Sequence, residues 1–285
     1  MVRASDAARV PAGSGNPTVV FFGLFGSWTH MAARKVFGAS ATFRESSTIS
    51  RVFEAVTNGS AAFGVVPIEN STEGGVNQTV DELIDRDLRI HGEVVLEIAQ
   101  CLMGQARDLS EIERVSSHPQ GLAQCRHWLA THLPNAEQIA SLSTTSAARD
   151  ATLDPQLAAI SSPLAAELNG LRIISQNIQD NAENATRFVV IAQSDAARSG
   201  KDKTSLVFST AHTRGALLKA LEVFDAAGLN LTRIESRPAS GRRWEYVFLT
   251  DLEGHREDPE VARALRELES RCSMVRVLGS YARTT

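Results

Sequence analysis

Three runs of polar residues lie directly against apolar stretches of this sequence. The run NATRFVVI (184–191) places a hydroxyl and a cation at the mouth of an apolar segment, and the runs PIENSTEG (67–74) and SHPQ (117–120) follow apolar segments in the same way. Loops on rigid elements carry a large share of binding and catalytic residues. The three runs together therefore predict a cleft that is lined from several directions.

The side chains in two of these runs indicate acid–base and ion-pair chemistry. Thr186 has a hydroxyl that does not ionise near neutral pH but can donate a hydrogen bond, or it is simply a β-branched strand residue. Arg187 could hold a substrate carboxylate in fork geometry, or pair with Glu69 or another acid. Glu69 itself could act as a base, an acid or a helix-capping anion.

Two further segments have both a structural and a functional interpretation. Ser117 with Gln120 forms a capping box, which explains Ser117 without a ligand, while Gln124 lies off the apolar stripe of the same predicted helix and is either exposed or functional. Ser27 and Thr29 lie between a predicted strand and a helix, where they either cap the helix or help to bind an anion. The motifs GxGxxG and Walker A are absent from the sequence, so no nucleotide cofactor is expected.

Composition narrows the function classes. The chain has 285 residues, of which 43% are hydrophobic and 22% charged, which is typical of a soluble protein. A net charge of -4 argues against nucleic-acid binding, and no apolar run approaches the roughly 20 residues that span a bilayer. The three cysteines are far apart and odd in number. They predict neither a metal site nor a disulfide framework, and fit a reducing cytoplasm.

The first two thirds of the chain alternate between strand and helix patterns. Apolar strands are predicted at 19–22, 62–67 and 93–103, and helices at 29–37 and 118–133. Alternation of this kind is typical of βαβ units and predicts a largely parallel sheet in an α/β domain.

The last third shows a different order of elements. Its patterns predict strand, helix, two strands, helix and strand between residues 204 and 281, which is the ferredoxin-like βαββαβ motif. We therefore predict four segments. They are a disordered tail at 1–16, a catalytic α/β domain at 17–194, a linker at 195–203 and a small α+β domain at 204–285.

Taken together, the motifs resemble those of prephenate dehydratases with a C-terminal ACT regulatory domain. The resemblance covers about residues 19–281 and rests on FGLFGSWTHMAA (22–33), VVPIENSTEGGVN (65–77), SHPQGLAQC (117–125), NATRFVVI (184–191), TRGALLKAL (213–221) and ESRP (235–238). It implies a catalytic domain of two α/β lobes, like a periplasmic binding protein, followed by the ACT domain. It also implies a cofactor-free reaction in phenylalanine biosynthesis, in which prephenate becomes phenylpyruvate, water and carbon dioxide.

The resemblance also assigns roles to individual residues. The residues expected in catalysis are Thr186, Glu69, Asn70, Gln124 and Ser117. Those expected to bind substrate are Arg187, Phe188, Ser27, Thr29 and Ser71. Those expected to bind phenylalanine as a feedback inhibitor are Gly215, Ala216, Leu217, Asn230, Glu235, Ser236, Arg237 and Pro238. No metal ligand is expected.

Other functions stay open at this point. The nearest alternatives are an arogenate dehydratase or a prephenate decarboxylase that keeps the ring hydroxyl, and a more distant one is a non-catalytic amino-acid sensor. The expected partners are prephenate and phenylalanine, with no nucleic acid and no membrane, in a cytoplasmic homodimer or homotetramer. The expected enzyme is monofunctional, because no helical chorismate mutase segment precedes residue 19.

Overall fold

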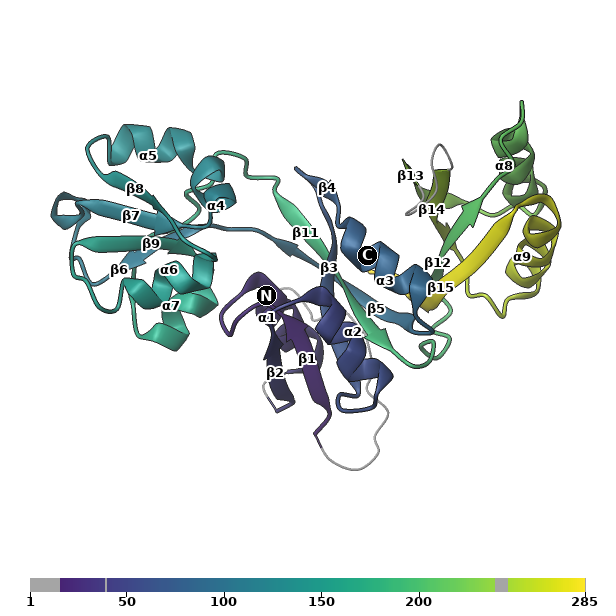
Figure 1. Ribbon diagram of the computed structural model, residues 1–285, viewed down its shortest axis with the longest axis horizontal. Helices are drawn as coiled ribbons and strands as arrows, with labels where there is room; N and C mark the ends of the chain where they lie inside the picture. The colour runs from purple at the N-terminus through teal and green to yellow at the C-terminus, as the bar shows by residue number, and fades with distance from the viewer. Residues whose placement is uncertain (1–15, 39, 239–245, 285) are drawn as a thin grey trace.

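The computed structural model describes residues 16–38, 40–238 and 246–284. Three β-sheets follow one another along the long axis of the molecule (Figure 1). We call the unit around the central sheet lobe 1, the unit at one end lobe 2, and the unit at the other end the ACT domain. The predicted tail lies outside the described residues apart from Asn16. No helix within the described residues is long and apolar enough to cross a membrane.

Lobe 1 is built on a six-stranded sheet with the order β2-β1-β3-β11-β5, and β4 pairs with β3. β1 is parallel to β2 and β3, whereas β11 is antiparallel to both β3 and β5. Its strands are β1 (Thr18–Phe22), β2 (Thr42–Ser46), β3 (Phe63–Asn70), β4 (Gly74–Gly75), β5 (Arg89–Glu97) and β11 (Ala185–Ala192), and its helices are α1 (Trp28–Phe37), α2 (Ile49–Thr57) and α3 (Asn77–Asp85).

Both faces of this sheet are covered. Helix α1 packs on one face, where Ala32 and Ala33 contact the cluster that includes Val19 and Phe21. Helices α2 and α3 pack on the other face, in a second cluster that includes Val52. Strands covered on both faces are nearly continuous apolar runs, which is why the sequence pattern identified β1 and β3.

Lobe 2 has a five-stranded sheet with the order β10-β6-β9-β7-β8. Its strands are β6 (Cys101–Gly104), β7 (Arg114–Ser117), β8 (Glu137–Ala140), β9 (Leu157–Ser161) and β10 (Arg172–Ser175), and its helices are η1 (Leu109–Glu111), α4 (Pro119–Gln124), α5 (Arg126–His132), α6 (Thr144–Asp150) and α7 (Pro163–Asn169). β7 is parallel to β8 and β9, while β6 is antiparallel to β9 and β10. Each lobe therefore has a mixed sheet, not the largely parallel sheet that the alternation predicted.

The chain crosses between the lobes twice. It leaves lobe 1 after β5, enters lobe 2 at β6, and returns between β10 and β11 (Figure 1). The prediction of one strand over 93–103 was wrong, because residues 98–100 separate two strands of different sheets. The sequence pattern does not mark this change of sheet, since Ile98 and Ala99 continue the apolar residues of the two strands.

The predicted helix at 118–133 is two helices, α4 and α5, which meet at Cys125. The N-cap of α4 is His118, not Ser117, because Pro119 occupies the first turn and the imidazole Nδ1 accepts a hydrogen bond from Gln120 N at 3.3 Å. The predicted capping box was therefore wrong by one residue.

The ACT domain has the predicted βαββαβ order. Its elements are β12 (Asp202–Ser209), α8 (Ala216–Ala226), β13 (Leu231–Pro238), β14 (Tyr246–Glu253), α9 (Pro259–Arg271) and β15 (Met274–Ala282). The four strands form an antiparallel sheet with the order β13-β14-β12-β15. β12 begins inside the predicted linker, and the predicted strand start at Arg243 lies outside the described residues.

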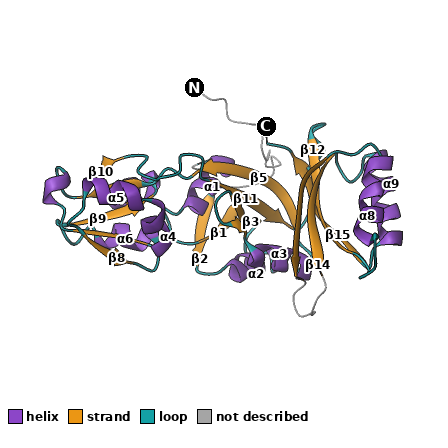
Figure 2. Ribbon diagram, turned by 90° about the horizontal axis from the view of Figure 1, so that it is seen from above, coloured by secondary structure: helices purple, strands orange, loops and turns teal. Residues whose placement is uncertain are grey.

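The ACT sheet is covered on both faces, but by different partners. Helices α8 and α9 pack on the outer face (Figure 2). On the inner face, Val207, Leu249 and Leu278 join the same apolar cluster as lobe 1 residues such as Ile68 and Ile90. At Gly279, with a φ of 157°, a Cβ would lie 2.2 Å from Ile90 O, so β15 lies backbone to backbone on β5. Lobe 1 and the ACT domain thus share one core.

Candidate active site

A cavity of about 750 Å³ lies between the two lobes. Lobe 1 contributes the loop after β1, the end of β3 and the start of β11, and lobe 2 contributes the loops after β7 and β8. Six of the residues predicted from sequence line the cavity, namely Ser27, Thr29, Asn70, Gln124, Thr186 and Phe188. Segments that are far apart in the chain therefore meet at one cleft, as the polar runs predicted.

Thr186 and Asn70 are paired across two neighbouring strands. They are register partners on β11 and β3, and Asn70 Nδ2 donates a hydrogen bond to Thr186 Oγ1 at 2.8 Å. The same Nδ2 lies 3.0 Å from Asn184 Oδ1. Thr186 is only 9% exposed, so its hydroxyl has few partners other than Asn70 and whatever occupies the cleft.

The orientation of the Asn70 amide follows from the turn that comes after β3. Asn70 Oδ1 accepts hydrogen bonds from Thr72 N at 2.9 Å and from Glu73 N at 3.1 Å. Because the oxygen is occupied by two backbone donors, Nδ2 must face Thr186. Thr186 Oγ1 is then an acceptor toward Asn70, and its own proton is left for an acceptor in the cleft.

A β-bulge shapes this end of the sheet. The register of β11 on β3 shifts between Arg187 and Phe188, so that Phe188 pairs with Pro67. Bulges near active sites commonly redirect side chains. Here the shift brings Pro67 and Asn70 to the same cavity, although residues three apart on a regular strand face opposite ways.

On the side of the cleft formed by lobe 2, two glutamine side chains form a pair. Gln100 Nε2 donates to Gln124 Oε1 at 3.0 Å, and Gln100 is only 3% exposed. Its backbone N donates to Gln179 Oε1 at 2.9 Å, and its carbonyl accepts from Ile178 N at 3.0 Å. Gln100 therefore joins both crossings between the lobes to the side chain of Gln124.

The lobes touch each other at the start of α1. Ser162 Oγ of lobe 2 donates to Gly26 O, and a Cβ on Gly26, where φ is 93°, would lie 3.0 Å from Ala165 Cα. Gly26 N donates to His30 Nδ1 at 3.1 Å. Burial, together with the charge of Arg34, lowers the pKa of His30 to about 4, so this imidazole is a neutral acceptor at pH 7.

The polar groups that face the cleft are almost all uncharged. Besides those already named, the uncharged groups include the hydroxyls of Ser143, Thr144 and Ser146. The imidazole of His118 also lines the cavity. Within the part of the chain that the structure describes, Glu73 carries the one carboxylate among the lining residues, and Lys and Arg are absent from the lining. An anionic ligand would be held here by hydroxyl, amide and backbone donors.

The ACT domain has a separate cavity of about 810 Å³. It is lined by the loop between β12 and α8, by the start of α8, and by Ser236, Phe248 and Ser273. Four of the eight residues predicted to bind phenylalanine line it, namely Gly215, Ala216, Leu217 and Ser236. The other four, Asn230, Glu235, Arg237 and Pro238, do not line it.

Comparison with known families agrees with this architecture. Residues 19–196, more than half of the chain, match the family model described as "Prephenate dehydratase". The chain belongs to the prephenate dehydratase family. A second model, described as "ACT domain", matches residues 204–270. The chain is therefore an enzyme of the carbon–oxygen lyase class with a regulatory ACT domain.

Individual members of the family are similar over most of the chain. A protein of Aquifex aeolicus named "Bifunctional chorismate mutase/prephenate dehydratase" is 44% identical over 263 residues, which is 92% of this chain and 73% of that protein. A crystal structure of prephenate dehydratase from Arthrobacter aurescens in complex with L-Phe has a TM-score of 0.85 and 38% identity, covering 93% of this chain and 90% of that one.

A third similar structure carries a different name. It is described as a novel type of quorum quenching acylase, with a TM-score of 0.84 and 32% identity, and the alignment covers 94% of this chain and 98% of that one. The prephenate dehydratase fold is therefore shared with a protein to which another activity is attributed.

Two residues of the family motifs do not face the cleft. Side chains alternate along a strand, so Arg187 lies on the face of β11 opposite to Thr186, where it pairs with Glu93 at 2.8 Å and Asp251 at 2.7 Å. Glu69 lies on the same side, 3.7 Å from Arg187 Nη1, and does not line the cavity. The substrate-binding role expected for Arg187 and the catalytic role expected for Glu69 do not fit these positions. The alternative, that Arg187 pairs with acids, does.

Two expected site serines also have structural partners. Ser117 is fully buried, and its Oγ donates to Ile160 O at 2.7 Å. Ser71 Oγ accepts from Ala185 N at 3.0 Å and donates to Glu183 O at 3.3 Å, which fastens the turn after β3 to the start of β11. Neither side chain lines the cavity. Both residues support the cleft and do not face a ligand in it.

The sequence reasoning did not assign several residues that line the cleft, among them Gln100, His118 and Glu73. Gln100 lay inside a segment interpreted as one strand. His118 and Glu73 lay inside the polar runs already noted, where the residue before Pro119 is the natural N-cap and Glu73 follows the Asn70 turn.

Proposed function

We propose that prephenate binds in the cleft and that the Thr186 hydroxyl donates a hydrogen bond to the ring hydroxyl as it leaves. The observation that carries this proposal is the contact from Asn70 Nδ2 to Thr186 Oγ1 at 2.8 Å, since it leaves the Thr186 proton directed to the cleft. A hydrogen bond placed on a leaving group in a water-poor site typically contributes about 10²–10³-fold to the rate.

The reaction balances without a cofactor. The electron pair of the bond between the ring and its carboxylate moves into the ring as carbon dioxide leaves, and the ring carbon–oxygen bond breaks to release the hydroxyl. One proton converts this hydroxyl to water, and the remaining product is phenylpyruvate. Because the ring becomes aromatic, the enzyme mainly has to orient prephenate and assist the departing hydroxyl.

The two carboxylates of prephenate are held by neutral donors in this proposal. Helix α1 begins at the cleft, where Ser27 and Thr29 offer hydroxyls and the first-turn amides offer a positive helix end. Ser143 and Thr144 face them from lobe 2. The apolar ring lies against Phe22, Trp28 and Phe188 in the lobe 1 wall, which are lining residues.

Glu73 takes the place that the sequence resemblance gave to Glu69 as the candidate carboxylate. It lines the cleft from the turn that follows Asn70, and its backbone N is bound by the Asn70 side chain. We propose that the proton that converts the leaving hydroxyl to water reaches it by way of Glu73 or of water next to it.

Replacing Thr186 tests the proposal. We expect Thr186→Ala to lower kcat for phenylpyruvate formation by about 10²–10³-fold while KM changes far less, since the lost hydrogen bond strengthens only as the hydroxyl leaves. Thr186→Ser keeps the hydroxyl and is the matched control, which should retain most of the activity. A Thr186→Ala enzyme with nearly normal kcat would remove Thr186 from the mechanism.

We also propose that the ACT cavity binds phenylalanine as a feedback inhibitor. In support, the related Arthrobacter aurescens structure is described as a complex with L-Phe. Gly215, Ala216, Leu217 and Ser236 would then contact the amino acid. Leu218, Ile234 and Tyr246 are exposed apolar side chains on the same domain, and we propose that they lie between ACT domains in a homodimer or homotetramer. Sedimentation with and without phenylalanine tests this assembly.

We propose a cytoplasmic location, which fits three cysteines that are all free thiols, two of them buried. Incubation with prephenate and with arogenate, with and without phenylalanine, separates the remaining enzyme alternatives. Release of carbon dioxide with retention of the ring hydroxyl would favour a decarboxylase, and binding without turnover would favour a sensor. An acylase needs an activated nucleophile, whereas among the described residues the hydrogen-bond partner of Thr186 Oγ1 is an amide.

A further inference from the structure

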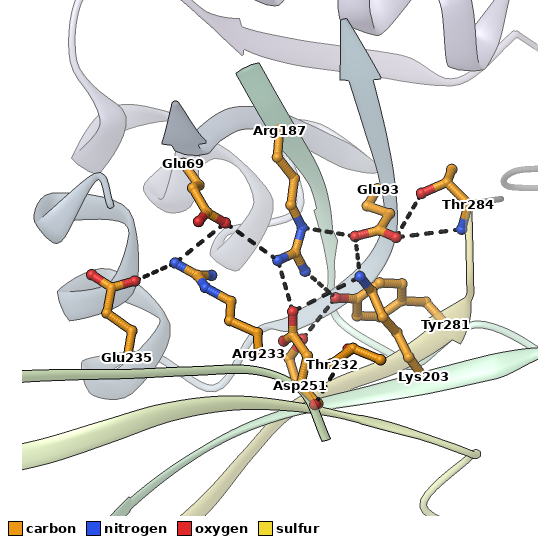
Figure 3. A network of polar contacts seen from close by, with 11 residues as sticks. Glu69, Glu93, Arg187, Lys203, Thr232, Arg233, Glu235, Asp251, Tyr281 and Thr284 are labelled. Carbon is orange, nitrogen blue, oxygen red and sulfur yellow. Dashed lines mark hydrogen bonds and ion pairs between the residues drawn. The ribbon is translucent and has the colours of Figure 1, made fainter. Parts of the chain in front are cut away.

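The catalytic pair lies beside a second pair on the same two strands. Asn70 and Thr186 form one rung of β3 and β11, and the next rung is Glu69 and Arg187. The first rung faces the cleft. The second faces the ACT domain (Figure 3). The proposed catalytic hydroxyl and a cation that is held by the regulatory domain therefore belong to adjacent residues of β11.

Arg187 is held by three partners from two parts of the molecule. Its Nε donates to Glu93 of β5 at 2.8 Å, its Nη1 to Asp251 of β14 at 2.7 Å, and its Nη2 to the Tyr281 hydroxyl at 2.9 Å. Lys203 Nζ lies 2.7 Å from the same Glu93 oxygen (Figure 3). Asp251, Tyr281 and Lys203 all belong to the ACT domain.

These groups are buried and charged. The side chains of Glu93 and Asp251 are each 2% exposed. Burial alone would raise the pKa of both carboxyl groups, but Arg187 and Lys203 hold it below its ordinary value. Removing one member of a buried charge group leaves the others uncompensated, so the position of Arg187 follows that of its ACT partners.

Glu69 is the loosest member of the group. Its Oε2 lies 3.7 Å from Arg187 Nη1 and 3.4 Å from Arg233 Nη2, so it is shared between a lobe 1 cation and an ACT cation. Arg233 also pairs with Glu235 (Figure 3). A small shift of β13 would draw Glu69 toward Arg233 and away from Arg187, which gives the rung two arrangements.

Strand β13 connects this rung to the ACT cavity. Ser236 lines the cavity, while its neighbour Glu235 lies against lobe 1, where a Cβ on Gly75 would come within 2.8 Å of Glu235 Oε1. Arg237 likewise pairs with Asp81 of α3 in lobe 1. Alternate residues of β13 thus face the effector cavity and the catalytic domain, just as alternate residues of β11 face the cleft and the ACT domain.

We propose that the charge group of Arg233, Glu69 and Arg187 transmits the state of the ACT cavity to Thr186. The proposal rests on the proposed function, in which Thr186 assists dehydration and phenylalanine occupies the ACT cavity. Arg187 and Glu69 are positioning residues that act through the neighbouring rung. Occupation of the cavity shifts β13, Glu69 moves toward Arg233, and the hydrogen bond from Asn70 to Thr186 loses its geometry.

Arg233→Met in the full chain is the decisive variant, because it removes the ACT cation without touching the cleft. We expect effector-free kcat and KM close to those of the parent, phenylalanine still bound in calorimetry, and an inhibition constant raised by at least about fivefold, the lower end of typical allosteric coupling. Arg233→Lys keeps the charge but loses the forked guanidinium group. Its inhibition constant should lie between those of the parent and of Arg233→Met. It also decides the question if Arg233→Met does not fold.

The matched control is Arg276→Met. Arg276 of β15 also reaches lobe 1, where it donates to the carbonyls of Leu83 at 3.0 Å and of Arg86, but it lies outside the charge group. Arg276→Met should have the same inhibition constant for phenylalanine as the parent. Equal loss of inhibition in both variants would mean general loosening of the domain contact and would overturn the proposal.

Arg187→Lys tests the positioning role. A lysine carries its three donors on one nitrogen and cannot reproduce the planar fork by which three nitrogens of Arg187 reach Glu93, Asp251 and Tyr281. We therefore expect kcat to fall by about tenfold or more with little change in KM, an effect expected when only transition-state alignment is lost. If phenylalanine inhibits Arg233→Met with the same inhibition constant as the parent, the transmission route is refuted while the proposed function stands. Absence of phenylpyruvate formation by the parent chain would refute the proposed function instead.

Discussion

The two faces of strand β11 carry opposite kinds of polar chemistry. On the cleft face, Thr186 belongs to a set of hydroxyls and amides that are mostly uncharged and that keep donors available. On the ACT face, Arg187 belongs to a set of buried charges whose donors are taken up by other protein groups. Substrate binding needs groups that lack a partner, whereas domain attachment needs groups that are fully paired. A strand with a two-residue repeat serves both needs in adjacent residues.

The largest expected effect comes from removing a charge on the ACT face. Asp251→Ala leaves two buried cations, Arg187 and Lys203, to share the single buried carboxylate of Glu93, and we expect it to lower the free energy of unfolding by about 3–5 kcal/mol. Asp87, whose side chain is 88% exposed in its pair with Arg89, is the matched control, and Asp87→Ala should cost about 1 kcal/mol or less. Urea unfolding of both variants measures the contrast. Equal losses would show that burial does not distinguish the two pairs.

On the cleft face, Asn70→Ala should affect turnover more than stability. Without the amide, the Thr186 hydroxyl rotates freely and the turn at Thr72 loses its acceptor, so we expect kcat to fall by about 10²–10³-fold. The same change should cost about 1–3 kcal/mol of unfolding free energy. Steady-state kinetics alongside thermal unfolding separates the two effects. A variant that is destabilised but fully active would contradict the assignment of Asn70 to the cleft face.

A smaller effect is expected from the glutamine pair. Gln100→Met has nearly the same volume but cannot donate to Gln124 Oε1, so the Gln124 amide is free to turn. A lost hydrogen bond of about 1 kcal/mol corresponds to a decrease of roughly fivefold to tenfold in kcat/KM. The measurement is prephenate turnover, with Gln105→Met as control, since Gln105 Nε2 binds only the backbone of lobe 2 at the carbonyls of Ala151 and Thr152.

The last expected effect concerns pH and is almost absent near neutrality, where the parent and a His30 variant should not differ. The pKa of His30 is about 4 in the folded chain and near 6.5 when unfolded. The unfolded chain therefore takes up the proton first as the pH falls, and stability should decline from about pH 6.5 to about pH 4. His30→Asn keeps an acceptor for Gly26 N and should lack this part of the decline. If both chains lose stability in parallel over this range, His30 is not the titrating group.

Prediction from the sequence succeeded where one physical signal dominated. The apolar runs at β1, β3 and β11 are buried on both faces, and the order of elements after residue 200 gave the ACT fold. The sequence predicts Thr186 and Asn70 at one cleft because Asn70 ends one apolar strand and Thr186 leads into another. The same logic fails for Arg187. The motif presents Thr186, Arg187 and Phe188 as one group, although strand geometry sends the middle residue to the other face.

Other details depended on contacts between distant segments. The sequence pattern over 93–103 does not show that the chain changes lobes at residues 98–100, so Gln100 was hidden inside a predicted strand. The bulge at Ile68 is set by the pairing of β3 with β11 and not by the local sequence. The sequence pattern therefore does not show which side chains near Asn70 face the cleft, and it wrongly includes Glu69 among them. The sequence motif predicts Glu235 in the effector site, yet its side chain lies against Gly75, which is 160 residues away in the chain, and pairs with Arg233.

The close backbone approach at Gly279 limits the ways in which feedback inhibition could be removed from this enzyme. Deleting residues 202–285 would uncover the apolar side chains of lobe 1 that now pack on Val207, Leu249 and Leu278. It would also remove Asp251 and Lys203, which pair with Arg187 and Glu93. A truncated chain would then expose a sheet face with apolar and charged side chains, and it would aggregate. Desensitised strains of an organism that carries this chain are therefore expected to harbour single-residue changes on β13 or in the effector cavity, with the regulatory module still in place.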